Sequence, residues 1–253
     1  MRFAPMAWLA AFLLTTLSAC AEDPQRVLFI GNSYTGVNKL PEVFLEIVKS
    51  SGRTSPVVKS STPGGRTLKQ HLGIAGSMKL VDEGGWDVVV LQGQSQEPAI
   101  AEKDESVRKE FVESAAELCR RVRAKSPKAK IYFYETWARH ADYWSAAKKG
   151  ADVGANPKEM QARLRKWYGF VAKENQATLV PCGDAWELNY ASSAAVRLHT
   201  KDHSHPEFVG TYLNALIFFS KIYDAKAPAP KWTGKVDEAQ AKLMQGYAAQ
   251  VLK

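Results

Sequence analysis

The sequence predicts a single α/β domain in which a central parallel sheet of about five strands lies between two layers of helices. Short apolar runs alternate with longer segments of helical periodicity along almost the whole chain, which is typical of βαβ units. The length of 253 residues and the apolar fraction of 45% fit one domain with a sizeable core. No internal repeat or low-complexity segment is present, and we expect residues 26–253 to form this one domain.

The predicted strands are apolar runs of four to six residues bounded by turn residues. Residues 27–30 are apolar throughout and are followed by Gly31, and residues 86–91 are rich in valine and follow Gly84 and Gly85. The three remaining strands are expected at 56–60, which has the weakest pattern, at 130–134 and at 177–180. Continuous apolar character indicates strands that are buried on both faces.

Segments of helical periodicity separate these strands. Pro41 at the first turn marks the start of a helix over 41–50, and 105–124 is a long amphipathic helix. Further helices are expected at 160–175, at 206–223, where Pro206 would begin the helix, and at 236–252. Connections of this length place consecutive strands parallel, so that their carboxyl ends share one edge of the sheet.

The N-terminus has the pattern of a secretion signal. Arg2 is followed by an apolar run over 7–17, which is too short to span a bilayer. The junction Leu17-Ser18-Ala19-Cys20 resembles the lipobox of bacterial lipoproteins, in which the cysteine is lipidated. We expect 1–19 to be the signal, 20–25 a short tether, and Cys20 the membrane anchor of an exported periplasmic or cell-surface protein. Plain cleavage after Ala19 is the alternative.

Charge and cysteine content narrow the classes of partner. The net charge of +8 is spread along the chain in short doublets, which argues against a nucleic-acid interface. Cys119 and Cys182 remain in the domain after Cys20, and they could form one disulfide or stay as two buried thiols. Their spacing predicts no metal site.

Polar residues follow three of the predicted strands and therefore meet at one rim. Ser33 lies just past the first strand, Gln94 past the strand over 86–91, and Arg139 past the strand over 130–134. A serine becomes a useful nucleophile only when a base removes its proton and a third group orients that base. Asp202 and His205, three residues apart in a predicted turn, could supply both groups, although this spacing is also common in simple capping pairs.

Two segments could stabilise the negative charge that develops on a carbonyl oxygen during acyl transfer. The turn at Gly64 and Gly65 can aim a backbone N–H into the site, and Gln94 carries a side-chain amide. Taken singly, each of these features is more often a turn or a surface amide.

Together these segments resemble the sequence blocks of the SGNH (GDSL-like) hydrolase superfamily. The resemblance spans residues 27 to about 219 and is carried, in order, by Gly31-Asn32-Ser33, Gly65-Arg66-Thr67, Gln92-Gly93-Gln94-Ser95 and Asp202-x-x-His205-Pro206. It implies a flavodoxin-like three-layer fold, Ser33 as nucleophile, His205 as base and Asp202 as the group that orients it. It also implies an oxyanion hole formed by the Ser33 N–H, the Gly65 N–H and the Gln94 side chain.

The chain departs from the family pattern at two positions. Asn32 replaces the usual aspartate before the serine, and Gln94 stands where the family has the asparagine of its third block. The third block is also similar to the Gln-Gly-Glu segment of SGNH carbohydrate esterases. Further similarity to an exported bacterial subgroup of unassigned function lies in Gln94-Ser95-Gln96, Thr136-Trp137-Ala138-Arg139 and Gly210-Thr211-Tyr212-Leu213.

The resemblance implies a serine esterase that needs no metal and no organic cofactor. We expect an acyl, and most simply an acetyl, ester on a carbohydrate as substrate, with Asn32, Gln92, Trp137 and Arg139 on the substrate side of the site. Aromatic residues after the fourth strand could stack on sugar rings, and Arg139 could meet a sugar carboxylate; packing of these residues is the competing interpretation. A lipase or lysophospholipase, a catalytically silent glycan-binding lipoprotein and an acyltransferase remain alternatives.

Overall fold

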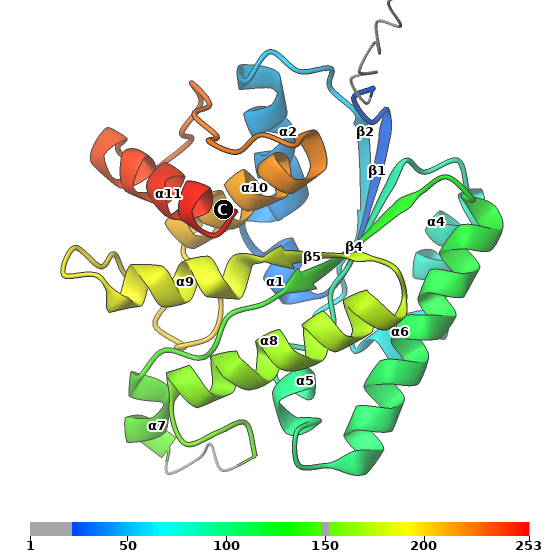
Figure 1. Cartoon of the computed structure of the whole chain (residues 1–253), viewed down its shortest axis with the longest axis horizontal. Helices are drawn as coiled ribbons and strands as arrows, with labels where there is room; N and C mark the ends of the chain where they lie inside the picture. Colours follow the sequence, from blue (N-terminus) through cyan, green and yellow to red (C-terminus); the bar gives the residue numbers. More distant parts are fainter. Residues whose placement is uncertain (1–21, 148–151, 253) are drawn as a thin grey trace, which may run out of the picture.

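The computed structural model describes residues 22–147 and 152–252, and within them a five-stranded parallel sheet forms the centre of the molecule (Figure 1). The predicted signal, Cys20 and part of the tether lie outside the described residues. The strands are β1 (Arg26–Ile30), β2 (Val57–Ser61), β3 (Val88–Leu91), β4 (Lys130–Glu135) and β5 (Thr178–Pro181). Their order in the sheet is β2-β1-β3-β4-β5, which confirms the predicted fold class.

The strands form where they do because their side chains bury on both faces. Val27 and Phe29 face one hydrophobic cluster, whereas the alternate residues Leu28 and Ile30 face the other. Strand β3 starts two residues later than predicted. Gly84 and Gly85, both with positive φ, turn the chain, and Trp86 then packs beside the sheet with its backbone N–H on Ser126.

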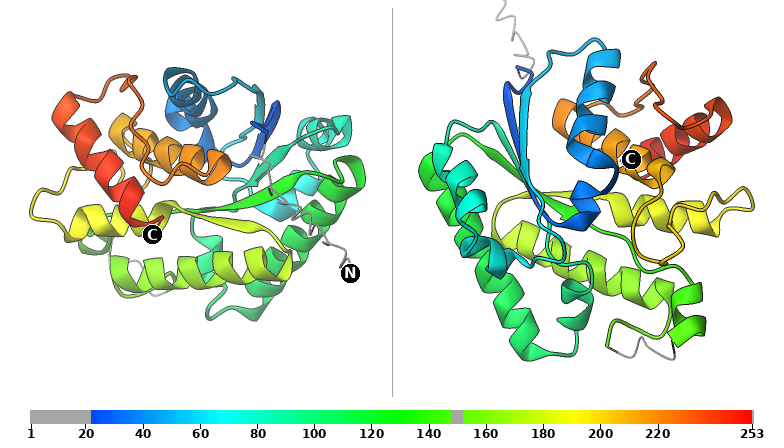
Figure 2. Two further views of the ribbon diagram at one scale, coloured as in Figure 1. Left: turned by 45° about the horizontal axis from the view of Figure 1, so that its top comes forward. Right: turned by 180° about the vertical axis from the view of Figure 1, so that it is seen from behind.

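Two helix layers cover the sheet, as the two views of Figure 2 show. One layer contains α2 (Leu40–Ser50), α9 (Cys182–Ala191), α10 (Phe208–Tyr223) and α11 (Glu238–Gln250). The other contains α3 (Leu68–Leu72), α4 (Ala75–Glu83), α6 (Glu105–Lys125) and α8 (Pro157–Glu174). Three short elements, α1 (Ser33–Gly36), α5 (Glu97–Ile100) and α7 (Asp142–Ala147), follow the carboxyl ends of β1, β3 and β4.

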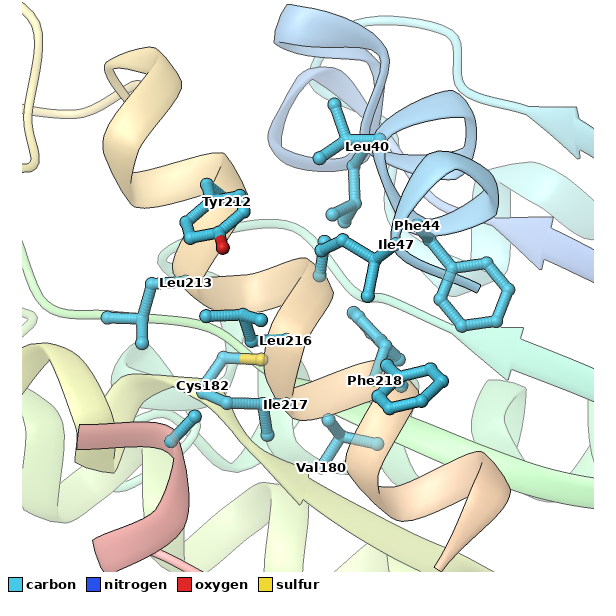
Figure 3. Close-up of a cluster of buried hydrophobic side chains, with 14 of the residues drawn as sticks. Leu40, Phe44, Ile47, Val180, Cys182, Tyr212, Leu213, Leu216, Ile217 and Phe218 are labelled. Atoms are coloured by element: carbon cyan, nitrogen blue, oxygen red, sulfur yellow. The ribbon is translucent and has the colours of Figure 1, made fainter. Parts of the chain in front are cut away.

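The first layer is held by apolar side chains that α2 and α10 direct at each other and at the sheet (Figure 3). Leu40, Phe44 and Ile47 of α2 meet Leu216 and Phe218 of α10, all of them fully buried. Phe218 also packs edge-on against Phe29 of β1, with ring centroids 5.5 Å apart. This contact fixes α10, and therefore the loop that precedes it, relative to the strand that carries Ser33.

The predicted start of the helix over 206–223 was wrong. Helix α10 begins at Phe208 instead of Pro206, because Pro206 forms an isolated antiparallel bridge with His199 and Glu207 donates its N–H to the Leu198 carbonyl. The proline therefore closes the loop that carries Asp202 and His205. Helix α8 starts three residues earlier than predicted, at Pro157, because the Asn156 side chain caps it.

Within residues 22–147 and 152–252, no helix is long and apolar enough to cross a membrane. Cys119 lies on α6 in one hydrophobic cluster and Cys182 lies at the start of α9 in the other. Both are buried free thiols, so of the two alternatives the structure selects unpaired cysteines.

Candidate active site

Ser33, His205 and Asp202 form a continuous hydrogen-bonded series at the carboxyl edge of the sheet. The Oγ atom of Ser33 lies 2.9 Å from Nε2 of His205, and Nδ1 of the same imidazole lies 2.5 Å from Oδ2 of Asp202. Ser33 follows β1. Strand β2 lies on one side of β1 and strand β3 on the other, so the chain reverses its direction across the sheet here and Ser33 stands at the topological switch point. The arrangement allows His205 to accept the Ser33 proton while Asp202 holds the imidazole.

Asp202 is fixed by donors from its own loop. Its Oδ1 atom accepts hydrogen bonds from the Thr200 hydroxyl at 2.6 Å and from the backbone N–H groups of Ser204 and His205, both at 2.9 Å. Partial burial alone would raise the pKa of Asp202, but these donors and the His205 imidazole together hold its pKa well below the usual range. The carboxyl is therefore ionised, which favours a proton on His205 Nδ1 and leaves Nε2 to face the serine.

The corner that carries Ser33 is braced from below by two amides. Asn32 caps α1 by accepting the Tyr34 N–H, and its Nδ2 donates to the carbonyls of Arg66 at 3.0 Å and Gly93 at 3.1 Å. Gln92 accepts the Asn32 N–H at 2.9 Å and the Thr35 hydroxyl at 3.0 Å through its Oε1. We expected both amides to contact substrate. Both are instead buried and use their polar groups to join three loops of the site.

A buried histidine supports the same corner from the other side. His71 donates from Nε2 to the Gly31 carbonyl at 2.9 Å, and its Nδ1 accepts from the Ser77 hydroxyl at 2.8 Å. Burial lowers the pKa of His71, in keeping with a neutral ring in this position. Sequence reasoning gave His71 no role in the site, because nothing in its local pattern shows that α3 returns to the end of β1.

The predicted oxyanion donors lie on the two loops that Asn32 joins. Gly65 has a φ of 69°, a left-handed conformation that favours glycine, and the carbonyl of the next residue, Arg66, accepts from Asn32. Gln94 accepts the backbone N–H groups of Gln96 at 2.7 Å and Glu97 at 3.1 Å through Oε1. Because a backbone N–H only donates, these contacts fix the orientation of the amide. The Gln94 NH₂ group makes no hydrogen bond to any described residue.

Trp137 has a structural position, contrary to the expected substrate contact. It is fully buried, and its ring stacks between Tyr34 at 4.3 Å and Trp186 at 4.0 Å, measured between centroids. Its indole N–H donates to the Ser204 carbonyl at 3.0 Å, so the stack also supports the loop of Asp202 and His205. Packing, the competing interpretation of this aromatic residue, accounts for these contacts.

Arg139 joins the first and third sequence blocks. Its Nη1 donates to the Tyr34 hydroxyl and its Nη2 to the Ser95 hydroxyl at 3.1 Å. Tyr34 in turn contacts the Ser204 hydroxyl at 3.0 Å, and its ring packs edge-on against His205 with centroids 5.6 Å apart. Sequence reasoning missed Tyr34 and Ser204 as members of the site. Their positions directly next to Ser33 and His205 were the available signal.

A cavity of about 760 Å³ lies beside this centre, between the segment that follows β4, the start of α8 and the second half of α9. Trp137 and Arg139 are on its wall, together with the first turns of α8 and a mostly apolar part of α9, among them Trp186, Leu188 and Tyr190. None of Ser33, Asp202 and His205 lines it. The cavity and the hydrogen-bonded series are therefore neighbours that share the segment after β4.

One group of side chains near the site has metal-ligating chemistry, although we predicted no metal site. Single ligand atoms of His140, Asp142 and His203 lie within 4.8 Å of one another. The Arg197 guanidinium reaches into the same group, 3.2 Å from Nδ1 of His203 and 3.6 Å from Oδ2 of Asp142. Because this fixed positive charge opposes a cation there, we assign the group no metal.

Comparison with known proteins places the fold. No family model and no curated protein matches the sequence. Among solved structures, a DUF4886 family protein from Bacteroides uniformis is 18% identical, with a TM-score of 0.76 over 90% of this chain and 94% of its own. A lipase/acylhydrolase from Enterococcus faecalis is 14% identical, with a TM-score of 0.60 over 83% of this chain and 100% of its own. A catalytic mutant of an acetylxylan esterase from Geobacillus stearothermophilus is 13% identical, with a TM-score of 0.59 over 80% and 96%.

At identities this low, the structural likeness establishes the fold alone, and activity has to be argued from the site. The parallel five-stranded sheet, the two helix layers and the place of Ser33 after β1 are the features that we expected from the sequence. The chain has the three-layer α/β fold of the SGNH (GDSL-like) hydrolases.

Proposed function

We propose that this protein is a serine esterase that hydrolyses an acyl ester, most simply an acetyl group carried by a carbohydrate. The observation that carries the proposal is the series Ser33 Oγ, His205 Nε2, His205 Nδ1 and Asp202, with contacts of 2.9 and 2.5 Å. The likeness to an acetylxylan esterase and to a lipase/acylhydrolase supports ester chemistry on this fold.

The proposed reaction has two acyl-transfer steps. His205 accepts the hydroxyl proton as Ser33 Oγ attacks the ester carbonyl, and the N–H groups of Ser33 and Gly65 with the Gln94 amide stabilise the oxyanion. Collapse of the tetrahedral intermediate breaks the ester C–O bond, and His205 returns its proton to the leaving alcohol. Water, deprotonated by His205, then attacks the acyl-enzyme and releases the acid and Ser33.

Hydrolysis of short p-nitrophenyl esters by residues 26–253 tests the nucleophile. We expect Ser33→Ala to lower kcat by about 10³-fold or more, because the remaining donors cannot replace a covalent nucleophile. Circular dichroism should show unchanged secondary structure. Equal turnover by the wild type and Ser33→Ala would refute the assignment of Ser33.

A lipase-type esterase is the second candidate, because the neighbouring cavity of about 760 Å³ has a largely apolar wall. Comparing acetyl with octanoyl and longer esters of the same alcohol separates the two. A kcat/KM that rises with chain length favours the lipase. A kcat/KM that is highest for acetyl, together with release of acetate from acetylated sugars, favours the glycan esterase. Binding of glycans without turnover of any ester would instead favour a silent binding protein.

We also propose that the chain is exported and anchored by a lipid on Cys20. The support is the sequence pattern of residues 1–20. Metabolic labelling with a fatty-acid analogue tests it. Labelling that persists in Cys20→Ala would refute Cys20 as the lipidation site.

A further inference from the structure

The guanidinium of Arg139 is a buried charge without a counter-ion. Only 9% of the residue is exposed, and no carboxylate lies within ion-pair distance of it in the part of the chain that the structure describes. Its two protein acceptors, the hydroxyls of Tyr34 and Ser95, use two of the five N–H donors of the group. The other three, including the buried Nε–H, have no acceptor among the described residues.

Burial of this guanidinium without a counter-ion costs free energy of folding. Removing a charge from water is unfavourable unless it is paired, and neutral hydroxyls compensate it only in part. The rings of Tyr34 and Tyr143, each less than 6 Å from the guanidinium carbon, add a modest cation–π contribution. A ligand that brings a negative charge would supply the missing counter-ion.

The guanidinium lies between the parts of the site that handle the ester. Tyr34 directly follows Ser33, and Ser95 directly follows Gln94, the proposed amide donor. Arg139 is also on the wall of the cavity beside the centre. An anionic group bound by Arg139 would therefore lie close to Tyr34 and Ser95, the neighbours of Ser33 and Gln94.

Several cations around this rim are unpaired. Arg66 on the loop of Gly65, Lys158 on the cavity wall and Lys201 beside Asp202 have no ion-pair partner within residues 22–147 and 152–252. Among the acidic groups near the rim, Asp142 pairs with Arg197 and Glu187 with Arg165, Asp202 accepts from the His205 imidazole, and Glu97 below the third block has no ion-pair partner among the described residues. Unpaired cations attract anionic ligands and hold them in place.

We propose that the substrate is an acylated sugar that carries a carboxylate, and that Arg139 binds this carboxylate through the remaining N–H donors of Nη1 and Nη2. The proposal rests on the proposed esterase function and narrows its substrate class to acidic glycans. A planar guanidinium suits a carboxylate because two parallel N–H donors can meet its two oxygens.

Equilibrium binding tests the proposal without requiring turnover. The probes are a uronic-acid tetrasaccharide and a neutral tetrasaccharide of the same linkage, measured by calorimetry on the Ser33→Ala chain. We expect the acidic probe to bind at least tenfold more tightly, and Arg139→Gln in the same chain to reduce that preference to about twofold. Lys128→Gln, at an exposed position just before the amino end of β4 and so at the opposite edge of the sheet, removes an equal charge and should leave the preference unchanged. Equal affinity for the two probes would overturn the proposal.

A kinetic ratio separates binding of the anion from general damage to the site. Wild type, Arg139→Lys and Arg139→Gln are compared on an acetylated uronate and on the same sugar with its carboxyl converted to the methyl amide. We expect the ratio of kcat/KM for acid over amide to fall in Arg139→Gln, with Arg139→Lys intermediate because it keeps the charge and loses the fork. Equal losses on both substrates would make Arg139 a positioning residue and overturn the proposal.

The two proposals fail separately. If no ester is hydrolysed but the acidic probe binds through Arg139, the esterase function fails and the anion site stands. If acid and amide are hydrolysed equally well in a Ser33-dependent reaction, the esterase stands and the anion site fails. Preference for anionic phospholipid vesicles over the acidic sugar would also overturn the proposed substrate.

Discussion

Asp202 uses both carboxylate oxygens to set the state of His205. Oδ2 accepts from the imidazole, while Oδ1 accepts from three donors of the same loop. The left-handed conformation of His203, with φ of 62°, bends the chain so that these donors converge. Orientation of the base is therefore a property of this one loop.

Asp202→Asn tests that role. An asparagine can donate to the imidazole and so stabilise the tautomer with the proton on Nε2, which cannot accept the Ser33 proton. We expect kcat on p-nitrophenyl acetate to fall by about 10³- to 10⁴-fold with little change in KM. A loss below tenfold would show that the carboxylate does not govern the tautomer.

Gly31 is required by close packing at the nucleophile corner. A Cβ atom at this position would lie 2.4 Å from Oγ1 of Thr35 and 2.7 Å from Oε1 of Gln92, which braces Asn32. We expect Gly31→Ala to lower the free energy of unfolding by about 1–3 kcal/mol and to reduce activity along with it.

Gly246→Ala is the matched control, because the exposed α11 position has no atom within 4 Å of an added Cβ. This change should raise the free energy of unfolding by roughly 0.5–1 kcal/mol. Urea unfolding of both variants gives the comparison. Unaltered stability in Gly31→Ala would mean that the corner can relax.

At the scale of elements, the short helix α5 places a buried carboxyl below the third sequence block. Glu97, in its first turn, accepts the Gln94 N–H at 3.3 Å and lies against Gly93. Burial, opposed by this hydrogen bond and reinforced by Glu110, raises the pKa of Glu97 to about 7. The carboxyl is thus largely protonated in mildly acidic solution.

This raised pKa predicts the pH dependence of stability. Between the unfolded and the folded pKa of Glu97, the folded protein retains a proton that the unfolded chain has lost. The contribution of protonated Glu97 to stability is therefore fully present below the unfolded pKa and is lost as pH rises towards 7. Over that range Glu97 should lower the free energy of unfolding by up to about 3 kcal/mol. Glu97→Gln should flatten the profile between pH 5 and pH 8 in urea titrations. Parallel profiles for the two proteins would contradict the shift.

At the scale of the whole molecule, the two helix layers keep the cysteines apart. Cys119 and Cys182 lie in hydrophobic clusters on opposite faces of the sheet, and burial raises the pKa of Cys119 to about 12 and that of Cys182 well above its usual value. Both thiols should resist a disulfide-exchange reagent in the folded domain of residues 26–253 and react on unfolding in guanidinium. Reducing agent should leave Tm unchanged. Rapid reaction of either thiol in the native domain would argue against this packing.

Much of the fold follows from local pattern. The apolar runs at 27–30 and 86–91 predict buried strands because a strand with no polar face can only lie inside a sheet. Helices α1, α3, α4, α5, α7 and α9 escaped prediction, because they are short or have weak periodicity and depend on tertiary packing.

The sequence by itself determined the α/β class and the position of the polar residues at the carboxyl edge of the sheet. It also identified Ser33, Asp202 and His205 as candidates, because these features depend on residue type and spacing. Only the tertiary structure decided which polar side chains face one another. Asn32, Gln92 and His71 brace the nucleophile corner, Trp137 is enclosed in a stack of rings, and Arg139 is left with an unbalanced charge. The physical reason is that burial and hydrogen-bond satisfaction arise from segments distant in the chain, and no local pattern encodes which partners they find.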